Sequence, residues 1–345
     1  MTDFPDVIDS EEVLDEVMTR PSRALESFVR TLPSPLLVVG AGGKMGPSLC
    51  VQARRAADAS GHDLEVIAVS RFSSEDARQW LEERGVRTLA ADVMDRAAVE
   101  RLPDATNVIY LVGQKFGTSE FPERTWAANT LAPAYVAERY PAARIVALST
   151  GNVYPLGPVE RGGADETEEL TPLGEYANAA VARERIFQYY ASRTGVAVTL
   201  VRLNYAVDLR YGVLVDIARK IVESGLVDVT MGYFNCIWQG DANDMILRSL
   251  KLAASPPAAI NLTGEEVHAV RDVATRLAQS MGLPVRFTGQ EAETALLSNA
   301  SKAVQALGRP ATPLDVVLRW TAHWVTSGKP LLGKPTHFEV RDGRY

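Results

Sequence analysis

Short runs of apolar residues alternate with helical stretches over the first two-thirds of the chain. The first run, at 36–39, lies between Pro35 and Gly40 and contains no polar residue. Further mainly apolar runs follow at 66–69, 88–90, 108–112, 144–148 and 197–203. Such runs are typical of strands that are buried on both faces of a parallel sheet. Helices are predicted between them at 47–59, 74–84, 125–139 and 176–193. This alternation predicts an α/β fold with a doubly wound parallel sheet of the Rossmann type.

The alternation is absent from the N-terminal end and loosens beyond residue 205. Residues 10–32 predict a helical arm, in which Ser10 is a good N-cap and Pro21 either breaks the helix or begins a second one. The arm would pack on the core or on a partner subunit. We therefore expect three parts: an N-terminal helical extension at 1–33, a Rossmann domain at 34–205 plus 237–263, and a smaller C-terminal α/β substrate lobe at 206–236 plus 264–345.

Composition and charge narrow the classes of function. The net charge is −7 and no run of Lys and Arg is present, which argues against nucleic-acid binding. The two cysteines and four histidines lack the spacing of metal ligands, so we expect no metal. No apolar stretch approaches the roughly 18 residues of a membrane span, and the acidic N-terminus does not resemble a signal peptide. These features predict a cytoplasmic protein with no nucleic-acid or membrane partner.

A glycine-rich loop follows the first predicted strand and opens the first predicted helix of the sheet. Its sequence at 40–46 is Gly-Ala-Gly-Gly-Lys-Met-Gly, which has the spacing G-x-x-G-x-x-G. Glycines in such a turn let backbone amides approach a pyrophosphate, and the helix N-terminus stabilises its charge. A glycine turn without a ligand is the alternative. We expect a nicotinamide dinucleotide here, bound through Gly40, Gly43, Lys44, Met45 and Gly46.

Residues at the ends of the second and third predicted strands bear on which dinucleotide binds. An acidic residue after the second strand would pair with the ribose hydroxyls of NAD, but this chain has Ser70 and Arg71 there. The planar guanidinium of arginine suits the extra phosphate of NADP, so NADP is favoured over NAD unless Arg71 is simply solvated. Asp92 and Val93 follow the third strand. The Asp92 carboxylate either accepts a hydrogen bond from the adenine amine or caps a helix at 94–101.

Further motifs follow in a recognisable order. Val112 and Gly113 end the fourth predicted strand, and Asn129 lies in the next helix. Thr150 ends the fifth strand, and Tyr176 opens a helix after Pro-Leu-Gly-Glu. With the glycine loop, these residues resemble the extended short-chain dehydrogenase/reductase family, the NAD(P)-dependent epimerase/dehydratase proteins, over roughly residues 35–265.

This resemblance implies roles for individual residues. Val112, Gly113 and Asn129 would bind the cofactor near its nicotinamide half. Tyr176 would be the acid/base, and Thr150 would orient a substrate oxygen. The resemblance also implies a homodimer formed through the helix that begins near Tyr176.

The chain departs from the family pattern next to Tyr176. That pattern is Tyr-x-x-x-Lys, but Ala180 stands where the lysine belongs. In the family, the lysine holds the nicotinamide ribose and lowers the tyrosine pKa, which is otherwise about 10 and makes tyrosine a poor base at neutral pH. Candidate replacements are Lys44, Lys115 and Arg183, which lies two helical turns beyond Tyr176 on the same face. For each of them, a solvated or phosphate-binding charge is the alternative.

Several of these residues also have a purely structural explanation. Tyr176 would then be a packed aromatic side chain, and the Thr150 hydroxyl would bond to local backbone at the strand end. Substrate contacts are expected after the sixth predicted strand, where Arg210 would hold a carboxylate or phosphate. The candidates there are Tyr205, Asp208, Arg210 and Tyr211.

Two functions follow from these observations. The first is an atypical NAD(P)-binding, epimerase/dehydratase-like oxidoreductase that acts on a sugar-like or other hydroxylated small molecule by nicotinamide hydride transfer. The second is a cofactor-binding sensor or scaffold without turnover, which Ala180 motivates. An enzyme needs a cation near Tyr176, whereas a sensor does not.

Overall fold

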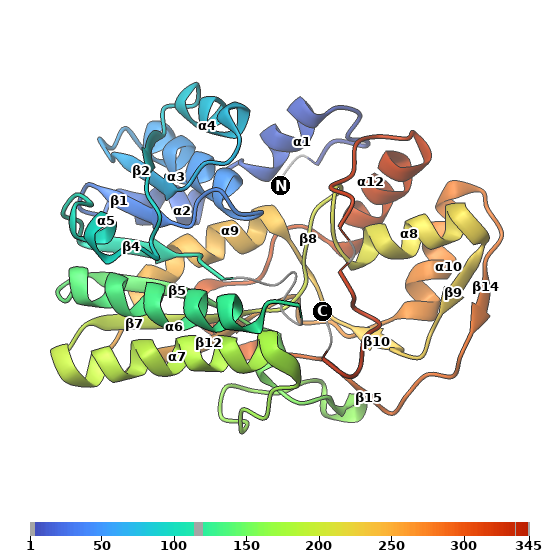
Figure 1. The fold of residues 1–345 in the computed structure, drawn as a ribbon. Coiled ribbons are helices and arrows are strands. Elements are labelled where there is room, and N and C mark those ends of the chain that lie inside the picture. Colours follow the sequence, from blue (N-terminus) through green and yellow to red (C-terminus); the bar gives the residue numbers. More distant parts are fainter. Residues whose placement is uncertain (1–3, 114–119, 335, 344–345) are drawn as a thin grey trace.

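A sheet of seven parallel strands forms the centre of the molecule (Figure 1). The structure is a computed structural model that describes residues 4–113, 120–334 and 336–343. The strands lie in the order β12-β7-β5-β4-β1-β2-β3. Their bounds are β1 (Leu36–Val39), β2 (Val66–Ser70), β3 (Arg87–Ala90), β4 (Asn107–Tyr110), β5 (Arg144–Thr150), β7 (Ala197–Leu203) and β12 (Ala258–Leu262). The order reverses between β1 and β4, as in a doubly wound sheet, so the predicted fold class is confirmed.

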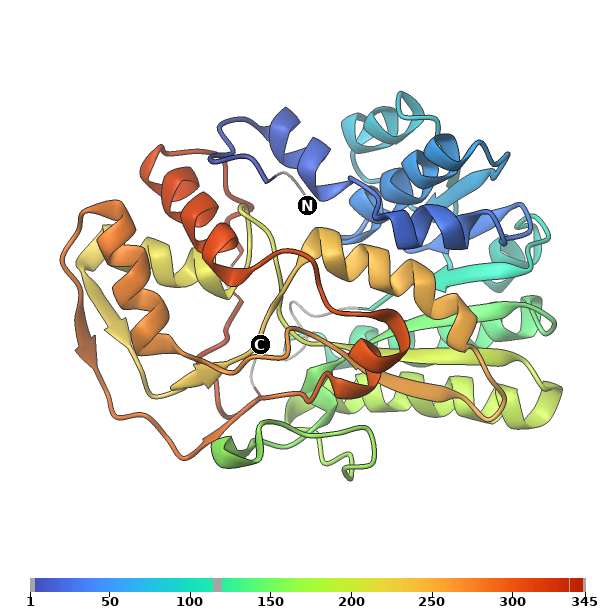
Figure 2. The ribbon, with the colours of Figure 1, turned by 180° about the vertical axis from the view of Figure 1, so that it is seen from behind.

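Helices cover both faces of this sheet (Figures 1 and 2). Alternate residues of β1 point to opposite faces, so Leu36 and Val38 join one buried core while Leu37 and Val39 join the other. The first face is covered by α3 (Gly46–Ser60), α4 (Glu75–Glu82), α9 (Gln239–Arg248) and α11 (Ser301–Leu307). The second face is covered by α5 (Arg96–Glu100), α6 (Pro122–Arg139) and α7 (Gly174–Thr194). Burial on both faces explains why the central strands β1, β2 and β4 are mainly apolar.

The N-terminal arm is helical, as predicted, and packs on its own chain. It consists of α1 (Glu11–Met18) and α2 (Arg23–Val29), and Pro21 lies between them. The Ser10 hydroxyl caps α1 by accepting a hydrogen bond from the Val13 amide at 3.2 Å. Buried side chains of α1 join the core of the smaller lobe, whereas those of α2 join the core of the sheet. The arm therefore connects the two parts of the molecule.

A smaller lobe follows β7 (Figure 1). Its core is built by α8 (Val213–Ser224), α10 (Val270–Met281) and α12 (Leu314–Thr326). Short strand pairs complete this side of the molecule: β9 (Leu226–Asp228) with β14 (Arg286–Thr288), β10 (Tyr233–Phe234) with β13 (His268–Ala269), β8 (Ala206–Val207) with β11 (Ile237–Trp238), and β6 (Gly157–Pro158) with β15 (Thr294–Ala295). The 3₁₀ turns are η1 (Gly151–Val153), η2 (Val159–Arg161) and η3 (Ser249–Leu252). Although α11 falls within the predicted lobe, it packs against β12 of the sheet.

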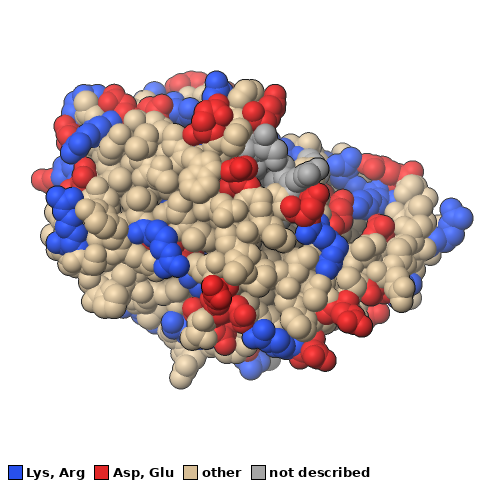
Figure 3. All heavy atoms as spheres, turned by 60° about the horizontal axis from the view of Figure 1, so that its bottom comes forward, with Lys and Arg blue, Asp and Glu red and all other residues tan. Residues whose placement is uncertain are grey.

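The ends of several elements differ from the predicted ones. β4 ends at Tyr110 rather than 112, and α7 begins at Gly174, two residues before Tyr176. α6 begins at Pro122 rather than 125, because proline is well suited to the first turn of a helix. α6 and α7 pack side by side, and their outer surface carries mainly uncharged side chains (Figure 3). No helix in the described part of the chain has the length and apolar character needed to cross a membrane.

Candidate functional site

The glycine loop lies at the carboxyl end of β1, beside the point where the strand order reverses. Gly40 has a φ of +86°, and a Cβ there would lie 2.9 Å from Cγ2 of Val112. A Cβ on Gly46 would overlap the carbonyl oxygen of Ala41. Both positions therefore require glycine, and α3 begins at once at Gly46 without a side-chain cap on its N-terminus. This arrangement leaves the helix N-terminus facing the edge of the sheet, where an anion is stabilised.

The loop also packs tightly against the end of β2. A Cβ on Gly42 would lie 2.5 Å from Oγ of Ser70, so this glycine is needed for the close approach. The sequence did not single out Gly42, because the neighbour that excludes a side chain comes from another strand. By contrast, a Cβ on Gly43 would lie 3.4 Å from the Gly40 carbonyl oxygen, which is an ordinary contact. A side chain would therefore collide with its neighbours at Gly40, Gly42 and Gly46. It would not collide at Gly43, the middle glycine of the predicted G-x-x-G-x-x-G spacing.

The ends of β2 and β3 place the residues predicted to choose between the dinucleotides. Arg71 is exposed directly after β2. Asp92 is exposed after β3, where its Oδ1 accepts a hydrogen bond from the Met94 amide at 2.9 Å. The alternative role of Asp92 as a helix cap is wrong, because Asp95 caps α5 through its bond to the Ala97 amide. Val93 is buried in the core of the second face.

Four predicted residues meet beyond the end of β4. Nη1 of Arg183 donates to the Val112 carbonyl at 3.0 Å and to Oδ1 of Asn129 at 2.7 Å. The Asn129 amide donates in turn to the Thr125 carbonyl at 2.8 Å. Gly113 is exposed above the guanidinium, and a Cβ there would overlap Nη1 of Arg183. Arg183 is thus buried, and it lies at the edge of the sheet that also carries the glycine loop. The other candidate cation, Lys115, lies outside the described residues.

Tyr176 lies half-buried in the first turn of α7, close to Tyr211. Burial raises the pKa of the Tyr211 phenol, and Asp216 and Tyr176 raise it further. The ammonium of Lys44 lies 4.8 Å from the centroid of the Tyr211 ring and donates to the Ala206 carbonyl at 2.9 Å. A cation from the glycine loop thus belongs to the same cluster as the two tyrosines.

Other predicted residues are engaged within the chain. The Thr150 hydroxyl caps η1 by accepting from the Asn152 amide at 3.2 Å, which is the local role considered as its alternative. Ala180 is fully buried against Val153 and Tyr154. The guanidinium of Arg210 pairs with three carboxylates, those of Glu11, Asp15 and Asp208. Because its charge is already compensated by the chain, Arg210 is poorly suited to hold an anionic substrate.

The C-terminal segment lies beside the residues that follow β5 and β7. A small cavity of about 20 Å³ is shared by Asn152, which follows Thr150, by Tyr205, which follows β7, and by Arg341. The Arg341 guanidinium donates to the Thr294 carbonyl at 2.8 Å and to its hydroxyl at 2.6 Å. The last described residues therefore help to enclose this small cavity. Nothing in the sequence pattern indicated this contribution, because it depends on the path of the returning chain.

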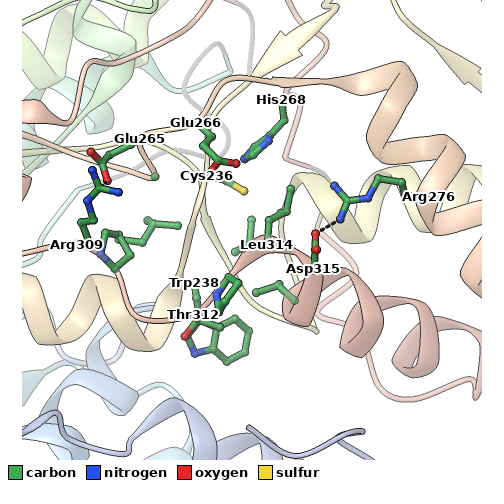
Figure 4. Close-up of a pocket in the computed structure, with 16 residues that line it drawn as sticks. Cys236, Trp238, Glu265, Glu266, His268, Arg276, Arg309, Thr312, Leu314 and Asp315 are labelled. Atoms are coloured by element: carbon green, nitrogen blue, oxygen red, sulfur yellow. Dashed lines mark hydrogen bonds and ion pairs between the residues drawn. The ribbon is translucent and has the colours of Figure 1, made fainter. Parts of the chain in front are cut away.

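A larger hollow of about 360 Å³ lies elsewhere, between the lobe and the segment that leads into α12 (Figure 4). Apolar residues such as Ile237 and Trp238 line it. Its charged side chains include two ion pairs, Arg276 with Asp315 and Arg309 with Glu265 at 3.3 Å. None of the predicted site residues lines this hollow. We therefore assign the candidate site to the sheet edge, where the required glycines and the two tyrosines lie.

Comparisons with known proteins identify a family for about half of the chain and a shared fold. Residues 36–207 match the model of the family described as the NAD dependent epimerase/dehydratase family. A search of the curated proteins finds no match.

Among solved structures, the UDP-glucuronic acid 4-epimerase from Bacillus cereus, in complex with NAD, is similar with a TM-score of 0.70 and 17% identity, over 85% of this chain and 96% of that one. The UDP-Glc/GlcNAc 4-epimerase from Campylobacter jejuni has a TM-score of 0.70 and 16% identity, over 86% of this chain and 100% of that one. RMD from Pseudomonas aeruginosa, complexed with NADPH, has a TM-score of 0.66 and 17% identity, with the same coverage of 86% and 100%. At these identities, the likeness establishes the fold alone.

Proposed function

We propose that this chain, whose residues 36–207 match the model of the NAD dependent epimerase/dehydratase family, binds a nicotinamide dinucleotide and uses it to oxidise or reduce a hydroxylated, sugar-like small molecule. The observation that carries this proposal is the turn at Gly40 and Gly46. Side chains are excluded there, and the turn leads directly into the N-terminus of α3. Such a cradle fits a pyrophosphate, because backbone amides and a helix N-terminus converge on one anion. The nucleotide-sugar enzymes among the similar structures suggest a nucleotide-linked sugar as the first substrate class to examine.

The sheet order divides the proposed ligand into two halves. With the pyrophosphate at the glycine loop, the adenine half would extend over β2 toward Ser70 and Arg71, and the nicotinamide half would extend past β4. Arg71 is exposed and suited to the extra phosphate of NADP, so we propose NADP as the preferred cofactor and NAD as the weaker ligand.

Fluorescence titration tests this proposal directly. We expect the purified chain to bind both NADPH and NADH, with NADPH bound more tightly. Arg71→Ser should weaken NADPH binding by about ten- to a hundredfold through loss of charge-assisted hydrogen bonds, and it should leave NADH binding unchanged. Arg101→Ser, which removes an exposed arginine at the end of α5, is the matched control. Failure to bind either nucleotide would contradict the proposed function, whereas equal binding would contradict only the preference for NADP.

The chemistry would depend on residues at the start of α7. When bound, the nicotinamide would accept a hydride from a carbinol carbon or return one to a carbonyl carbon. Tyr176 would move the proton at the substrate oxygen, and Thr150 would orient that oxygen. A proton at this position is expected to pass between the substrate and the Tyr176 hydroxyl, with Tyr211 and Lys44 close by to influence its charge.

One observation favours a second candidate, a cofactor-binding sensor or scaffold without turnover. Ala180 occupies the position of the family lysine and is packed against Val153 and Tyr154, so no cation is present four residues after Tyr176. A sensor would bind the dinucleotide as above, and it would show no substrate-dependent change in nicotinamide absorbance with any member of a nucleotide-sugar panel.

The exposed surface of α6 and α7 supports a homodimer as the assembly. Trp126 and Leu131 on α6 and Tyr189 on α7 are 39%, 44% and 54% exposed, on a face with few charges (Figure 3). Large exposed apolar side chains gathered on one face are typical of protein interfaces. We propose that two copies pack through these helices.

Light scattering after size-exclusion chromatography tests the dimer. The wild-type chain should elute as a dimer, and Tyr189→Glu should make it monomeric, because the substitution would bury a charge in the proposed interface. Val222→Glu replaces an equally exposed apolar residue on α8 and should leave the dimer intact. A wild-type chain that is monomeric at all concentrations would exclude this interface.

A further inference from the structure

Arg183 is a buried cation that has no carboxylate partner among the described residues. Three arginines are buried among the described residues: Arg183, Arg202 and Arg248. Arg202 pairs with Glu184 at 2.8 Å and Arg248 pairs with Asp244 at 2.5 Å. The polar partners of Arg183, by contrast, are neutral oxygens of Val112 and Asn129. The charge of Arg183 is therefore the least compensated of the three.

The guanidinium also retains unused donor capacity. Both of its hydrogen bonds come from Nη1, and its Nε is buried without a partner in the described structure. The Tyr110 hydroxyl, which lies close enough for the charge of Arg183 to act on it, is likewise buried without a partner. An arginine carries five N–H donors, and leaving such groups unsatisfied in a buried site is unfavourable. Among the described residues, both groups therefore lack a hydrogen-bond partner, and the guanidinium still has donors to offer.

The position of Arg183 defines which ligand would supply that acceptor. The guanidinium lies beneath the backbone at Val112 and Gly113, directly beyond β4, and Gly113 adds no side chain over it. β4 lies on the far side of β1 from β2. A dinucleotide with its pyrophosphate at the glycine loop and its adenine half at β2 would therefore bring its other half over Arg183.

We propose that Arg183 donates to the ribose and phosphate oxygens of the nicotinamide half and so supplies the cation that Ala180 lacks. This inference rests on the proposed binding of a nicotinamide dinucleotide. A side chain on a helix leans toward the helix N-terminus, so an arginine at 183 reaches back toward the level of residue 180. The longer side chain thus compensates for a position nearly one turn farther from Tyr176. Its hydrogen bond to Asn129 holds the guanidinium in place beneath Val112 and Gly113.

Affinities for a whole dinucleotide and for its adenine half test this assignment. Arg183→Met should weaken binding of NADPH and NADH by about ten- to a hundredfold, because it removes charge-assisted hydrogen bonds. The same variant should bind adenosine diphosphate as the wild type does, since this fragment ends at the glycine loop. Arg183→Lys should retain part of the dinucleotide affinity. Arg185→Met, at an exposed position on the same helix, is the control and should change neither affinity. Calorimetric titration measures all of these affinities, and thermal unfolding verifies that each variant is folded.

The outcomes separate this inference from the proposed function. If the wild type binds the dinucleotide and Arg183→Met binds it equally well, the role of Arg183 is overturned while cofactor binding stands. If Arg183→Met loses adenosine diphosphate to the same extent, Arg183 acts only by supporting the Val112 backbone, and the assignment is also wrong. If the wild type binds no dinucleotide, both the inference and the proposed function fail.

Discussion

Replacement of Tyr176 by phenylalanine is expected to lower kcat by about a hundredfold to ten-thousandfold while leaving dinucleotide affinity unchanged. The substitution removes only the hydroxyl, so the half-buried ring still packs at the start of α7. Without that hydroxyl, the proposed site loses the group that moves the proton at the substrate oxygen. The measurement is nicotinamide absorbance during turnover of whichever nucleotide-linked sugar the wild type accepts. Fluorescence titration reports the affinity separately.

The same helix provides a matched control for Tyr176. Tyr189→Phe removes the hydroxyl of a tyrosine far along α7 from Tyr176, keeps the ring on the proposed dimer face, and should leave kcat unchanged. Tyr211→Phe is informative because the phenol of Tyr211 interacts with that of Tyr176. If Tyr211 only influences the charge of Tyr176, its replacement should change the pH dependence of kcat more than its maximum. Unchanged turnover in Tyr176→Phe would show that Tyr176 is a packed aromatic side chain rather than the acid/base.

The largest expected effect on stability comes from Glu184, on the buried side of α7. Its carboxylate accepts from Nη2 of Arg202 at 2.8 Å, from Nε at 3.0 Å and from Oγ of Ser149 at 2.5 Å. Both side chains of the pair are almost fully buried, at 1% and 5% exposed. Glu184→Leu would leave the Arg202 charge buried without a counter-charge. We expect it to lower the free energy of unfolding by about 3–5 kcal/mol, measured by chemical denaturation.

Two further variants make this prediction specific to burial. Glu223→Leu breaks the exposed ion pair with Arg219 on α8 and should cost no more than about 1 kcal/mol. The double variant Glu184→Leu with Arg202→Met removes both buried charges together and should regain much of the lost stability. An equal loss in Glu184→Leu and Glu223→Leu would mean that the buried pair has no special role in stability.

The pattern of the sequence was sufficient for the sheet and for the location of the candidate site. Strands buried on both faces are mainly apolar, so the runs at 36–39 and 108–112 were readable without a structure. The glycine loop was readable because a backbone turn is a local property, and Gly40 and Gly46 are indeed the positions where a side chain cannot fit. The helical arm followed from local features in the same way, whereas the smaller lobe was expected because the alternation loosens beyond residue 205.

Contacts between distant segments could not be read from the pattern. Gly42 is required because Ser70 comes from another strand, and the charge of Arg210 is compensated by carboxylates from the N-terminal arm and its own loop. The sequence offered Lys44, Lys115 and Arg183 as equal candidates for the missing cation. Only the packing of α7 against α6 and the end of β4 brings Arg183 into a buried site without a counter-charge.

The sequence by itself therefore determined the class of fold and the alanine at position 180, and it predicted the edge of the sheet that carries the candidate site. The tertiary structure decided which charges are compensated and which side chains lie together at the candidate site. The physical reason is that apolar periodicity and glycine turns are set by neighbours along the chain. The burial and pairing of a charge depend on segments that meet only after folding, as Arg183 meets Val112 and Asn129.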